Sequence, residues 1–213
     1  MITQVSVPTR VGRSVLAALG TLSLSAAVLT APAHAADTGL FGTQDATYDG
    51  VYRQSLAVAG LAAADARIPA AAVDWLLDQQ CADGSFEAFR PNTSTPCSPS
   101  DPKNFSGPDT NSTSMAAIAL YLAGRTAPAR DAIVWLNDVQ NDDWGFPFHS
   151  GGASDANSTA LSVMALQTVQ PQDRSGRVPN AQKWLGTLKL KCASGGGLAY
   201  QKGSKANGLA SAQ

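Results

Sequence analysis

Two markers recur in the same order along the chain, and this internal repeat constrains the fold more than any other feature. The first is a Trp-Leu pair followed by a Gly-containing stretch, with its tryptophans 60 and 49 residues apart at Trp75, Trp135 and Trp184. The second is a polar segment before an Ala-rich run, which we align on asparagines 46 and 50 residues apart, Asn111, Asn157 and Asn207. Repeats of this length are typical of helical pairs stacked side by side.

Each repeat is predicted to contain two helices of different character. The Trp-containing helices are expected to begin at Pro69, Pro128 and Pro179, because proline is tolerated in the first turn of a helix. Their apolar residues recur at helical spacing. The helices that follow the second marker are apolar or small nearly all round, which predicts burial on several sides.

The helix patterns predict an inner row of small-residue helices enclosed by outer, more amphipathic ones. A first inner helix is expected from about Tyr48 to Ala64. Gly-rich loops, such as HSGGAS and CASGGGLAY, connect the helices, and no alternating pattern indicates a strand. The chain reaches only a few residues into a fourth inner helix at Gln213, so we expect a truncated repeat domain and a missing C-terminal part.

The N-terminal residues have the order of a secretory signal peptide. Arg10 and Arg13 precede an apolar stretch, residues 15–29, and the small-residue triplet 33–35 follows it. We therefore divide the chain into a signal peptide (1–35), a short linker (36–46) and a repeat domain (47–213). The prediction is a secreted, extracellular or surface-displayed protein with no membrane span in its mature part.

The net charge excludes some classes of binding partner, and the cysteine content indicates one disulfide. Removal of residues 1–35 leaves 13 basic against 16 acidic residues, a net charge of −3, with no basic block for nucleic acid or an anionic membrane. In an exported protein, Cys81 and Cys97 are better interpreted as a disulfide that closes one Pro/Ser/Thr-rich loop than as metal ligands. Cys192 is left over.

The first marker resembles the QW repeat of squalene and oxidosqualene cyclases. In the first copy, Trp75-Leu76 is followed by Gln80, Gly84 and the final aromatic Phe86. The second copy aligns through Gln140 and Gly145, with Pro147 at the final aromatic. The third has Lys189 for glutamine and ends at Gly197 and Tyr200. The resemblance implies an all-α fold, an α/α toroid shared with protein prenyltransferases, complement thioester domains and vitamin B12 carriers, here as an incomplete arc.

The same resemblance implies where a catalytic acid would lie. Triterpene cyclases protonate their substrate with an aspartate of a D-x-D-D motif, just ahead of an inner helix. Here the segments PDTNST and SDANST place Asn111 and Asn157 at its third position. An amide cannot supply the proton of a strong acid, so the sequence indicates that this activity is lost. The remaining Asp109 and Asp155 are expected to cap the inner helices.

Other catalytic chemistries have few candidate residues. His149 is the only histidine after residue 35, in the run NDDWGFPFH, and no metal-ligand spacing or G-x-S-x-G accompanies it. Glu87 is the only glutamate; paired with an aspartate it could serve a glycan hydrolase, although a solvated loop carboxylate is the simpler interpretation. We predict no metal site and no catalytic residue beyond these two candidates.

The leading hypothesis is a non-catalytic toroid that binds a small molecule or a surface partner. The predicted ligand contacts lie at the starts of the inner helices and in the aromatic run: Asp109, Asn111, Asp155, Asn157, Trp144 and Phe148. No cofactor is predicted from the residues themselves, whereas the vitamin B12 carriers imply a cobalamin-like ligand by analogy. The alternatives are a terpenoid cyclase or prenyltransferase-like enzyme and a secreted glycan hydrolase.

Overall fold

A computed structural model of the chain describes residues 38–42, 45, 49–172, 174–194 and 196–212. The predicted signal peptide, residues 1–35, lies outside the described residues, as does the predicted start of the repeat domain at residue 47. All the described residues belong to one unit of the chain, His34–Gln213. Among them, no helix is both long enough and apolar enough to cross a membrane.

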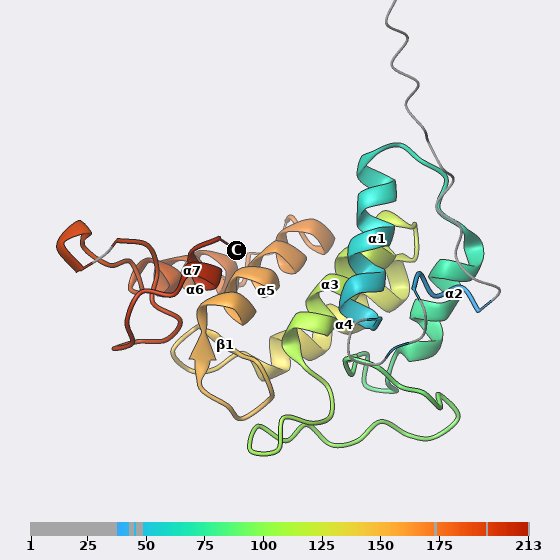
Figure 1. Cartoon of the computed structure of the whole chain (residues 1–213), viewed down its shortest axis with the longest axis horizontal. Coiled ribbons are helices and arrows are strands. Elements are labelled where there is room, and N and C mark those ends of the chain that lie inside the picture. The colour runs from blue at the N-terminus through green and yellow to red at the C-terminus, as the bar shows by residue number, and fades with distance from the viewer. Residues whose placement is uncertain (1–37, 43–44, 46–48, 173, 195, 213) are drawn as a thin grey trace, which may run out of the picture. The chain divides into compact units, whose positions relative to one another are not determined.

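Helices form nearly all the regular structure of the described residues (Figure 1). In chain order the α-helices are α1 (Val51–Ala63), α2 (Ala70–Gln79), α3 (Thr110–Leu122), α4 (Thr126–Val139), α5 (Ala156–Val169), α6 (Arg177–Gly186) and α7 (Gly208–Ala212). A short 3-10 helix covers Cys192–Ser194. Strands β1 (Phe146–Pro147) and β2 (Ser154–Asp155) pair antiparallel; they were not predicted, because two residues are too few to show an alternating pattern. The predicted all-α class is confirmed.

The helices alternate between an inner row and an outer layer, as predicted. Helix α3 packs against α1 on one side and α5 on the other, while α2 packs on α1, α4 on α3 and α5, and α6 on α5 (Figure 1). Ala116, Ala117 and Ala119 of α3 are fully buried. Their small side chains let the two neighbouring inner helices approach closely. Because α3 is covered by helices on several sides, nearly every face of it is apolar or small.

Large apolar side chains of the outer helices fill the space between the two layers. Leu76 of α2 and Ile133 and Leu136 of α4 are completely buried in one cluster with Leu120 and Leu166 of the inner row. Burial of each such side chain contributes roughly 1.5–3 kcal/mol. A second, smaller cluster surrounds Trp184 of α6. The helical spacing of apolar residues seen in the sequence is therefore the spacing that builds the core.

Three inner helices begin with the same side-chain cap. Asp109 Oδ1 accepts a hydrogen bond from the Ser112 amide of α3 at 2.8 Å, and Asp155 Oδ1 accepts one from the Ser158 amide of α5 at 2.9 Å. The predicted capping role of both aspartates is thus confirmed. In α7 the cap is Asn207, whose Oδ1 accepts a hydrogen bond from the Ala210 amide at 3.0 Å.

This geometry corrects the alignment of the second marker. The structurally equivalent residues are Asp109, Asp155 and Asn207, and not Asn111, Asn157 and Asn207. Asp and Asn are nearly equal as N-caps, so one structural position holds different residue types in different repeats. Identity of the asparagines therefore pointed to the wrong register.

A second hydrogen bond fastens each loop to the inner helix that follows it. Four residues after each cap, a hydroxyl oxygen accepts from a loop amide: Thr113 from Phe86 at 3.0 Å, Thr159 from Phe146 at 2.9 Å, and Ser211 from Leu198 at 2.8 Å. Gln54 Oε1 of α1 accepts from Phe41 in the same way, at 2.9 Å. We call Phe41, Phe86, Phe146 and Leu198 the loop anchors.

The loop anchors correct the alignment of the first marker. Phe146, which is completely buried like Phe86, replaces Pro147 as the final residue of the second copy, and Leu198 replaces Tyr200 in the third. Residue Trp144 then corresponds to Gly84, where Gly145 had been aligned. The sequence alignment chose Gly145 because it is a glycine. The hydrogen bonds instead align the residues by their position relative to the helix cap.

The outer helices begin close to the predicted prolines. Helix α2 starts directly after Pro69, but α4 and α6 start at Thr126 and Arg177, two residues before Pro128 and Pro179. The first four amides of a helix have no intrahelical partner, so a proline in any of these positions removes no hydrogen bond. The first inner helix begins at Val51; the predicted start, Tyr48, lies outside the described residues.

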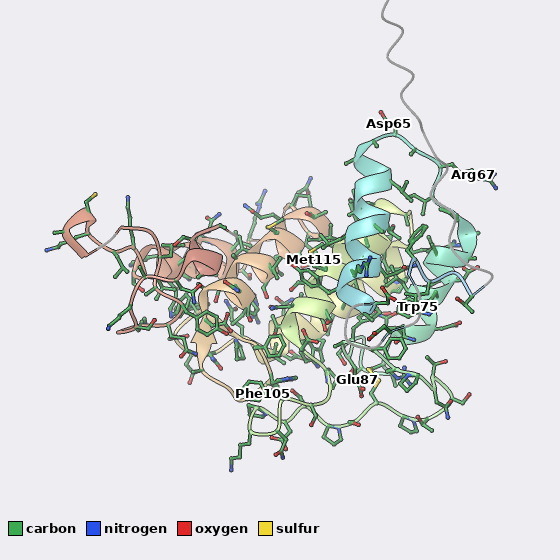
Figure 2. All side chains as sticks on the ribbon, viewed as in Figure 1. Asp65, Arg67, Trp75, Glu87, Phe105 and Met115 are labelled. Atoms are coloured by element: carbon green, nitrogen blue, oxygen red, sulfur yellow. A yellow bond between two sulfur atoms is a disulfide. The ribbon has the colours of Figure 1, made fainter. Side chains whose placement is uncertain are left out.

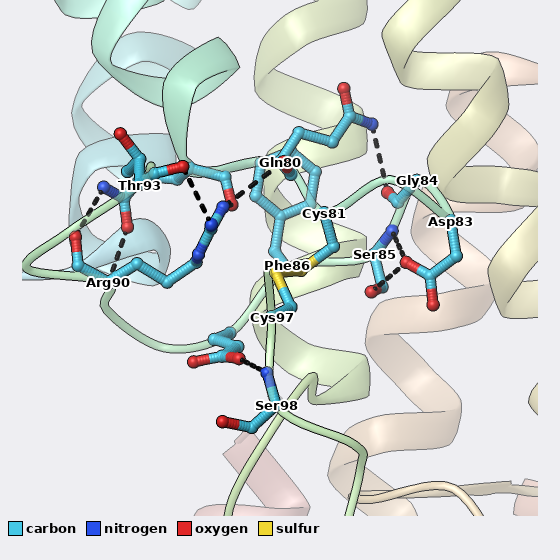
Figure 3. Close-up of a disulfide and its surroundings, with 12 residues drawn as sticks. Gln80, Cys81, Asp83, Gly84, Ser85, Phe86, Arg90, Thr93, Cys97 and Ser98 are labelled. Carbon is cyan, nitrogen blue, oxygen red and sulfur yellow. Dashed lines mark hydrogen bonds between the residues drawn. A yellow bond between two sulfur atoms is a disulfide. The ribbon is translucent and has the colours of Figure 1, made fainter. Parts of the chain in front are cut away.

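The predicted disulfide between Cys81 and Cys97 is confirmed, and Cys192 is a free, exposed thiol. The crosslink closes a loop with a sequence separation of 16 residues (Figure 3). Within it, the Arg90 guanidinium donates to the carbonyl oxygens of Thr93 and Thr95, and Gln79 binds both the amide and the carbonyl of Arg90. A covalent bond across a loop of this size stabilises the fold by about 3 kcal/mol, because it restricts the conformations of the unfolded chain.

Substitution of Asp109 tests the capping role. Asp109→Ala is expected to lower the free energy of unfolding by about 1–2 kcal/mol, because the first turn of α3 loses its acceptor. Asp109→Asn should lower it by less than about 0.5 kcal/mol, since Asn207 fills the same position in a later repeat. Urea unfolding followed by circular dichroism measures both, with the exposed Asp138→Ala as the control. Equal losses in both Asp109 variants would contradict a capping role.

Candidate functional site

Several predicted site residues meet in one pocket beside the start of α5. The pocket has a volume of about 340 Å³, and we call it the His149 pocket; its lining residues are Pro102, Phe105, Phe148, His149, Gly152, Ala153, Asp155, Tyr200 and Gln201. His149, Phe148 and Asp155 were predicted from the sequence. Phe105, Tyr200 and Gln201 were not, because they come from loops far apart in the chain.

The repeat itself delivers two aromatic residues to this pocket. Two residues after the loop anchors Phe86, Phe146 and Leu198, a carbonyl oxygen accepts from the first amide of the preceding inner helix. The acceptors are Ala88 for Val51 at 2.8 Å, Phe148 for Thr110 at 2.8 Å, and Tyr200 for Ala156 at 2.9 Å. This bond uses only the backbone. The side chain at this position is therefore free to vary, and Phe148 and Tyr200 line the pocket.

His149 is held in one orientation in the wall of the pocket. Only 4% of its surface is exposed, and its Nδ1 lies 3.0 Å from the Pro108 carbonyl oxygen. A carbonyl only accepts, so we assign a proton to Nδ1, and in the neutral imidazole Nε2 is then the acceptor. Nε2 is buried and has no hydrogen-bond partner among the described residues. His149 lies in the loop between β1 and β2, and the sequence did not indicate that its ring is buried.

Two aromatic rings contact His149 in edge-to-face geometry. The centroid of Phe148 lies 4.6 Å from that of His149, with the ring planes at 77°, and Phe105 lies at 6.1 Å and 65°. Phe105 itself is 74% exposed on the loop before α3 (Figure 2). Large apolar side chains are seldom so exposed without a reason of packing or binding. One wall of the pocket is thus an aromatic surface open to solvent.

Asp155, at the end of β2, is a buried carboxylate that also lines the pocket. Burial raises its pKa above the ordinary value, and hydrogen bonds from Ser158, from the Asn157 amide and from the Tyr200 hydroxyl partly oppose this rise. Burial, together with the charge of Asp155, also raises the pKa of Tyr200. Both groups therefore retain their protons to higher pH than they would in water.

Asp109 is also buried, and it lies beside His149 without lining the pocket. The backbones of Asp109 and His149 form an antiparallel bridge. Burial raises the pKa of Asp109, whereas hydrogen bonds from Ser112 lower it. Because its carboxylate caps α3, we assign Asp109 a structural role at the start of this helix.

The remaining predicted residues lie outside the His149 pocket. Asn111 and Asn157 are half-buried at the second position of α3 and α5, and the Oδ1 of each is buried with no partner among the described residues. Trp144 lines a separate pocket beside α6. Glu87 is half-buried, and its Oε1 accepts from the Ser98 amide at 2.5 Å within the disulfide loop.

Glu87, the candidate acid of a hydrolase, does not line the His149 pocket. Figure 2 shows Glu87 and Phe105 at different points of the loop between α2 and α3. No group of three or more His, Cys, Asp or Glu side chains that could hold a metal ion occurs within the described ranges. The arrangement around His149 can therefore offer a ligand an aromatic wall, one unpaired acceptor nitrogen and a buried carboxyl with a phenol.

One signal in the sequence could have identified Tyr200. It follows a loop anchor by two residues, as Phe148 does, and this becomes visible once the anchors are aligned by spacing and not by residue type. Nothing in the sequence pattern indicates Phe105, because it lies in a loop that has no counterpart in the other repeats. Its place in the pocket depends on where that loop folds back.

The Tyr200 hydroxyl is expected to control the acidity of Asp155. Tyr200→Phe removes one donor and should raise the pKa of Asp155 further. Because this pKa is higher in the folded than in the unfolded chain, the free energy of unfolding falls as pH rises through it, and the fall should be larger in the variant. NMR titration of the Asp155 carboxyl carbon measures the pKa, with Tyr121→Phe as control. An unchanged or lowered pKa would contradict the contact.

The comparisons with known proteins bear on the fold. No protein-family model and no curated protein matches the chain. Among solved structures, the chain is similar to Candida albicans protein geranylgeranyltransferase-I, solved in complex with GGPP: the identity is 15% and the TM-score 0.57, over 77% of this chain and 47% of that one. The chain spans about half the length of the structure that it matches. The likeness shows the fold alone, an α/α toroid of helical hairpins as predicted.

Proposed function

We propose that the chain is a secreted, non-catalytic α/α-toroid protein that binds a small organic molecule in the His149 pocket. The observation that carries the proposal is an aromatic-lined pocket with His149 in its wall, whose buried Nε2 has no hydrogen-bond partner in the described part of the chain. A buried polar atom without a partner costs free energy, and a ligand that donates a hydrogen bond would remove that cost.

The residues of the pocket favour one kind of ligand. Phe105 and Phe148 offer flat apolar surface, the neutral His149 ring offers Nε2 as a hydrogen-bond acceptor, and the Asp155–Tyr200 pair offers polar partners. A ring or chain that is mainly apolar, with at least one N–H or O–H group, matches this combination. A volume of about 340 Å³ suits a small ligand. A cobalamin-like ligand would exceed it and would need walls from elsewhere.

The positions of the candidate catalytic acids support a binding role. The third positions of the two D-x-D-D-like segments are Asn111 and Asn157, and the aspartates beside them cap helices. Glu87 is engaged with the disulfide loop. A glycan hydrolase would need a second carboxylate close to Glu87, and a cyclase would need an aspartate where each asparagine stands.

Export is part of the proposal. The order of basic residues, apolar stretch and A-x-A triplet in residues 1–35 supports it, and so does the disulfide, because such crosslinks persist in oxidising surroundings. The free Cys192 is exposed, which is compatible with pairing to another chain. A mature N-terminus at Ala36 in the culture medium is the expected result.

A prenyltransferase-like enzyme is the second candidate. It is favoured by the fold likeness to the geranylgeranyltransferase-I structure, which was solved in complex with GGPP. On this chain a prenyl group would lie against Phe105 and Phe148. The two candidates differ in turnover: the binding protein keeps its ligand, whereas the enzyme transfers the prenyl group to an acceptor and releases the product.

Native mass spectrometry of the protein from its own culture medium tests the binding proposal. We expect an extra mass that is lost on denaturation. The matched variants are Ala153→Trp, which fills the pocket from an exposed position, and Ala127→Trp, an exposed position on α4. The extra mass should disappear from the first and persist in the second.

Two results would contradict the binding proposal. One is a bare polypeptide in the parent chain, and the other is an equal amount of ligand in the Ala153→Trp variant. A ligand whose mass equals that of a prenyl diphosphate, together with transfer of the prenyl group to an added acceptor peptide, would favour the enzyme.

A further inference from the structure

Trp144 occupies a backbone position that belongs to glycine in the other repeats. Two residues before each loop anchor, the backbone adopts a positive φ: 82° at Gly39, 88° at Gly84, 70° at Trp144 and 66° at Gly196. The local hydrogen bonds are also shared. Gln80 Nε2 donates to the Gly84 carbonyl at 3.0 Å (Figure 3), and Gln140 Nε2 donates to the Trp144 carbonyl at 3.0 Å.

The other repeats explain why glycine is usual at this position. A side chain on Gly39 would collide with the Ala71 carbonyl of α2, and one on Gly84 would come within 2.5 Å of the Asp131 carbonyl of α4. Both carbonyls lie four residues before the tryptophan of the outer helix. A left-handed backbone is also unfavourable for any residue with a Cβ atom, and for a bulky one above all.

At Trp144 the left-handed backbone is kept despite the Cβ atom, and a pocket takes the place of the close contact. The side chain is 43% exposed. It lines a pocket of about 330 Å³ between the loop and the start of α6, together with Gln140, Asn141, Asp142, Ser175 and Arg177. Strained backbone with an exposed aromatic side chain is typical of binding sites, because the fold gains nothing from the strain itself.

The neighbours of Trp144 are held in place by their own bonds. Arg177 Nη1 donates to the Asn137 carbonyl and to Gln140 Oε1, both at 2.9 Å. Asn141 Nδ2 donates to Ser154 Oγ at 2.9 Å. The indole therefore stands beside the guanidinium of Arg177, which is held in place, and the exposed carboxylate of Asp142.

This combination discriminates among ligand classes. The guanidinium of Arg177 disfavours a cation, the carboxylate of Asp142 disfavours an anion, and a rim that is polar apart from the indole disfavours a wholly apolar molecule. A neutral ring with C–H groups on its face and hydroxyl groups on its edge satisfies all three conditions. Its hydroxyls can donate to Asp142 and accept from Arg177.

We propose that the pocket at Trp144 is a saccharide-binding site, in which a neutral sugar ring stacks on the indole and its hydroxyls bind Asp142 and Arg177. The site goes beyond the proposed function and is independent of it, because it shares no lining residue with the His149 pocket. A glycan of a cell wall or cell surface supplies such rings, and the chain would dock on it through this pocket.

The experiment probes the purified chain on an array of immobilised neutral plant, fungal and bacterial-wall oligosaccharides, followed by calorimetric titration with the soluble form of the best binder. The variants are Trp144→Gly, which restores the residue of the other repeats, and Asp142→Ala. The exposed Asp138→Ala on α4 is the matched control. Melting temperature and native mass are recorded for each variant.

The parent chain and Asp138→Ala should bind equally. Trp144→Gly should weaken binding more than tenfold while its Tm stays within about 3 °C of the parent value, because relief of the left-handed strain offsets the lost contacts of the indole. Asp142→Ala should weaken binding several-fold. Both should retain any ligand of the His149 pocket.

Three results would overturn the site. One is the absence of any bound glycan on the array. Another is unchanged affinity in Trp144→Gly. The last is undiminished binding in Asp142→Ala together with a Trp144→Gly variant that unfolds, since the indole would then be a structural residue. None of these depends on whether the His149 pocket carries a ligand.

Discussion

The hydrogen bonds between the first turn of each inner helix and the loop before it are the constraint on which the rest of the structure depends. In α3, the Thr113 hydroxyl binds the Phe86 amide, and the Asp109 amide binds the Phe86 carbonyl at 3.0 Å. One residue of the loop is thereby paired on both backbone groups while its ring is completely buried. The loop cannot shift by one residue without losing these bonds and exposing the ring.

Each fastened loop in turn links two repeats. The carbonyl two residues after the anchor accepts the first amide of the inner helix in the preceding repeat, as Phe148 does for α3 and Tyr200 does for α5. Adjacent hairpins are therefore joined by backbone bonds at the helix starts and by small side chains along the inner row. Such a stack is held by contacts between neighbours, and its stability grows repeat by repeat.

Both pockets arise where a side chain departs from the repeat while the backbone follows it. Phe148 stands where the first repeat has Ala88, and Trp144 stands where it has Gly84. These substitutions leave the shared hydrogen bonds in place, so the fold tolerates them. Function in repeat folds is expected at such positions, because the side chains there are not required for stacking.

The sequence by itself determined the all-α class, the alternation of buried and amphipathic helices, the disulfide and the helix caps, since each depends on local spacing or on the chemistry of one residue pair. It did not determine the register between repeats, because Asp109 and Asn207 serve as the same cap and Gly84 and Trp144 share one backbone conformation. Only the tertiary structure buried His149 and brought Phe105 and Tyr200 to its pocket. These contacts join loops distant in the chain, and helical periodicity carries no information about where loops meet.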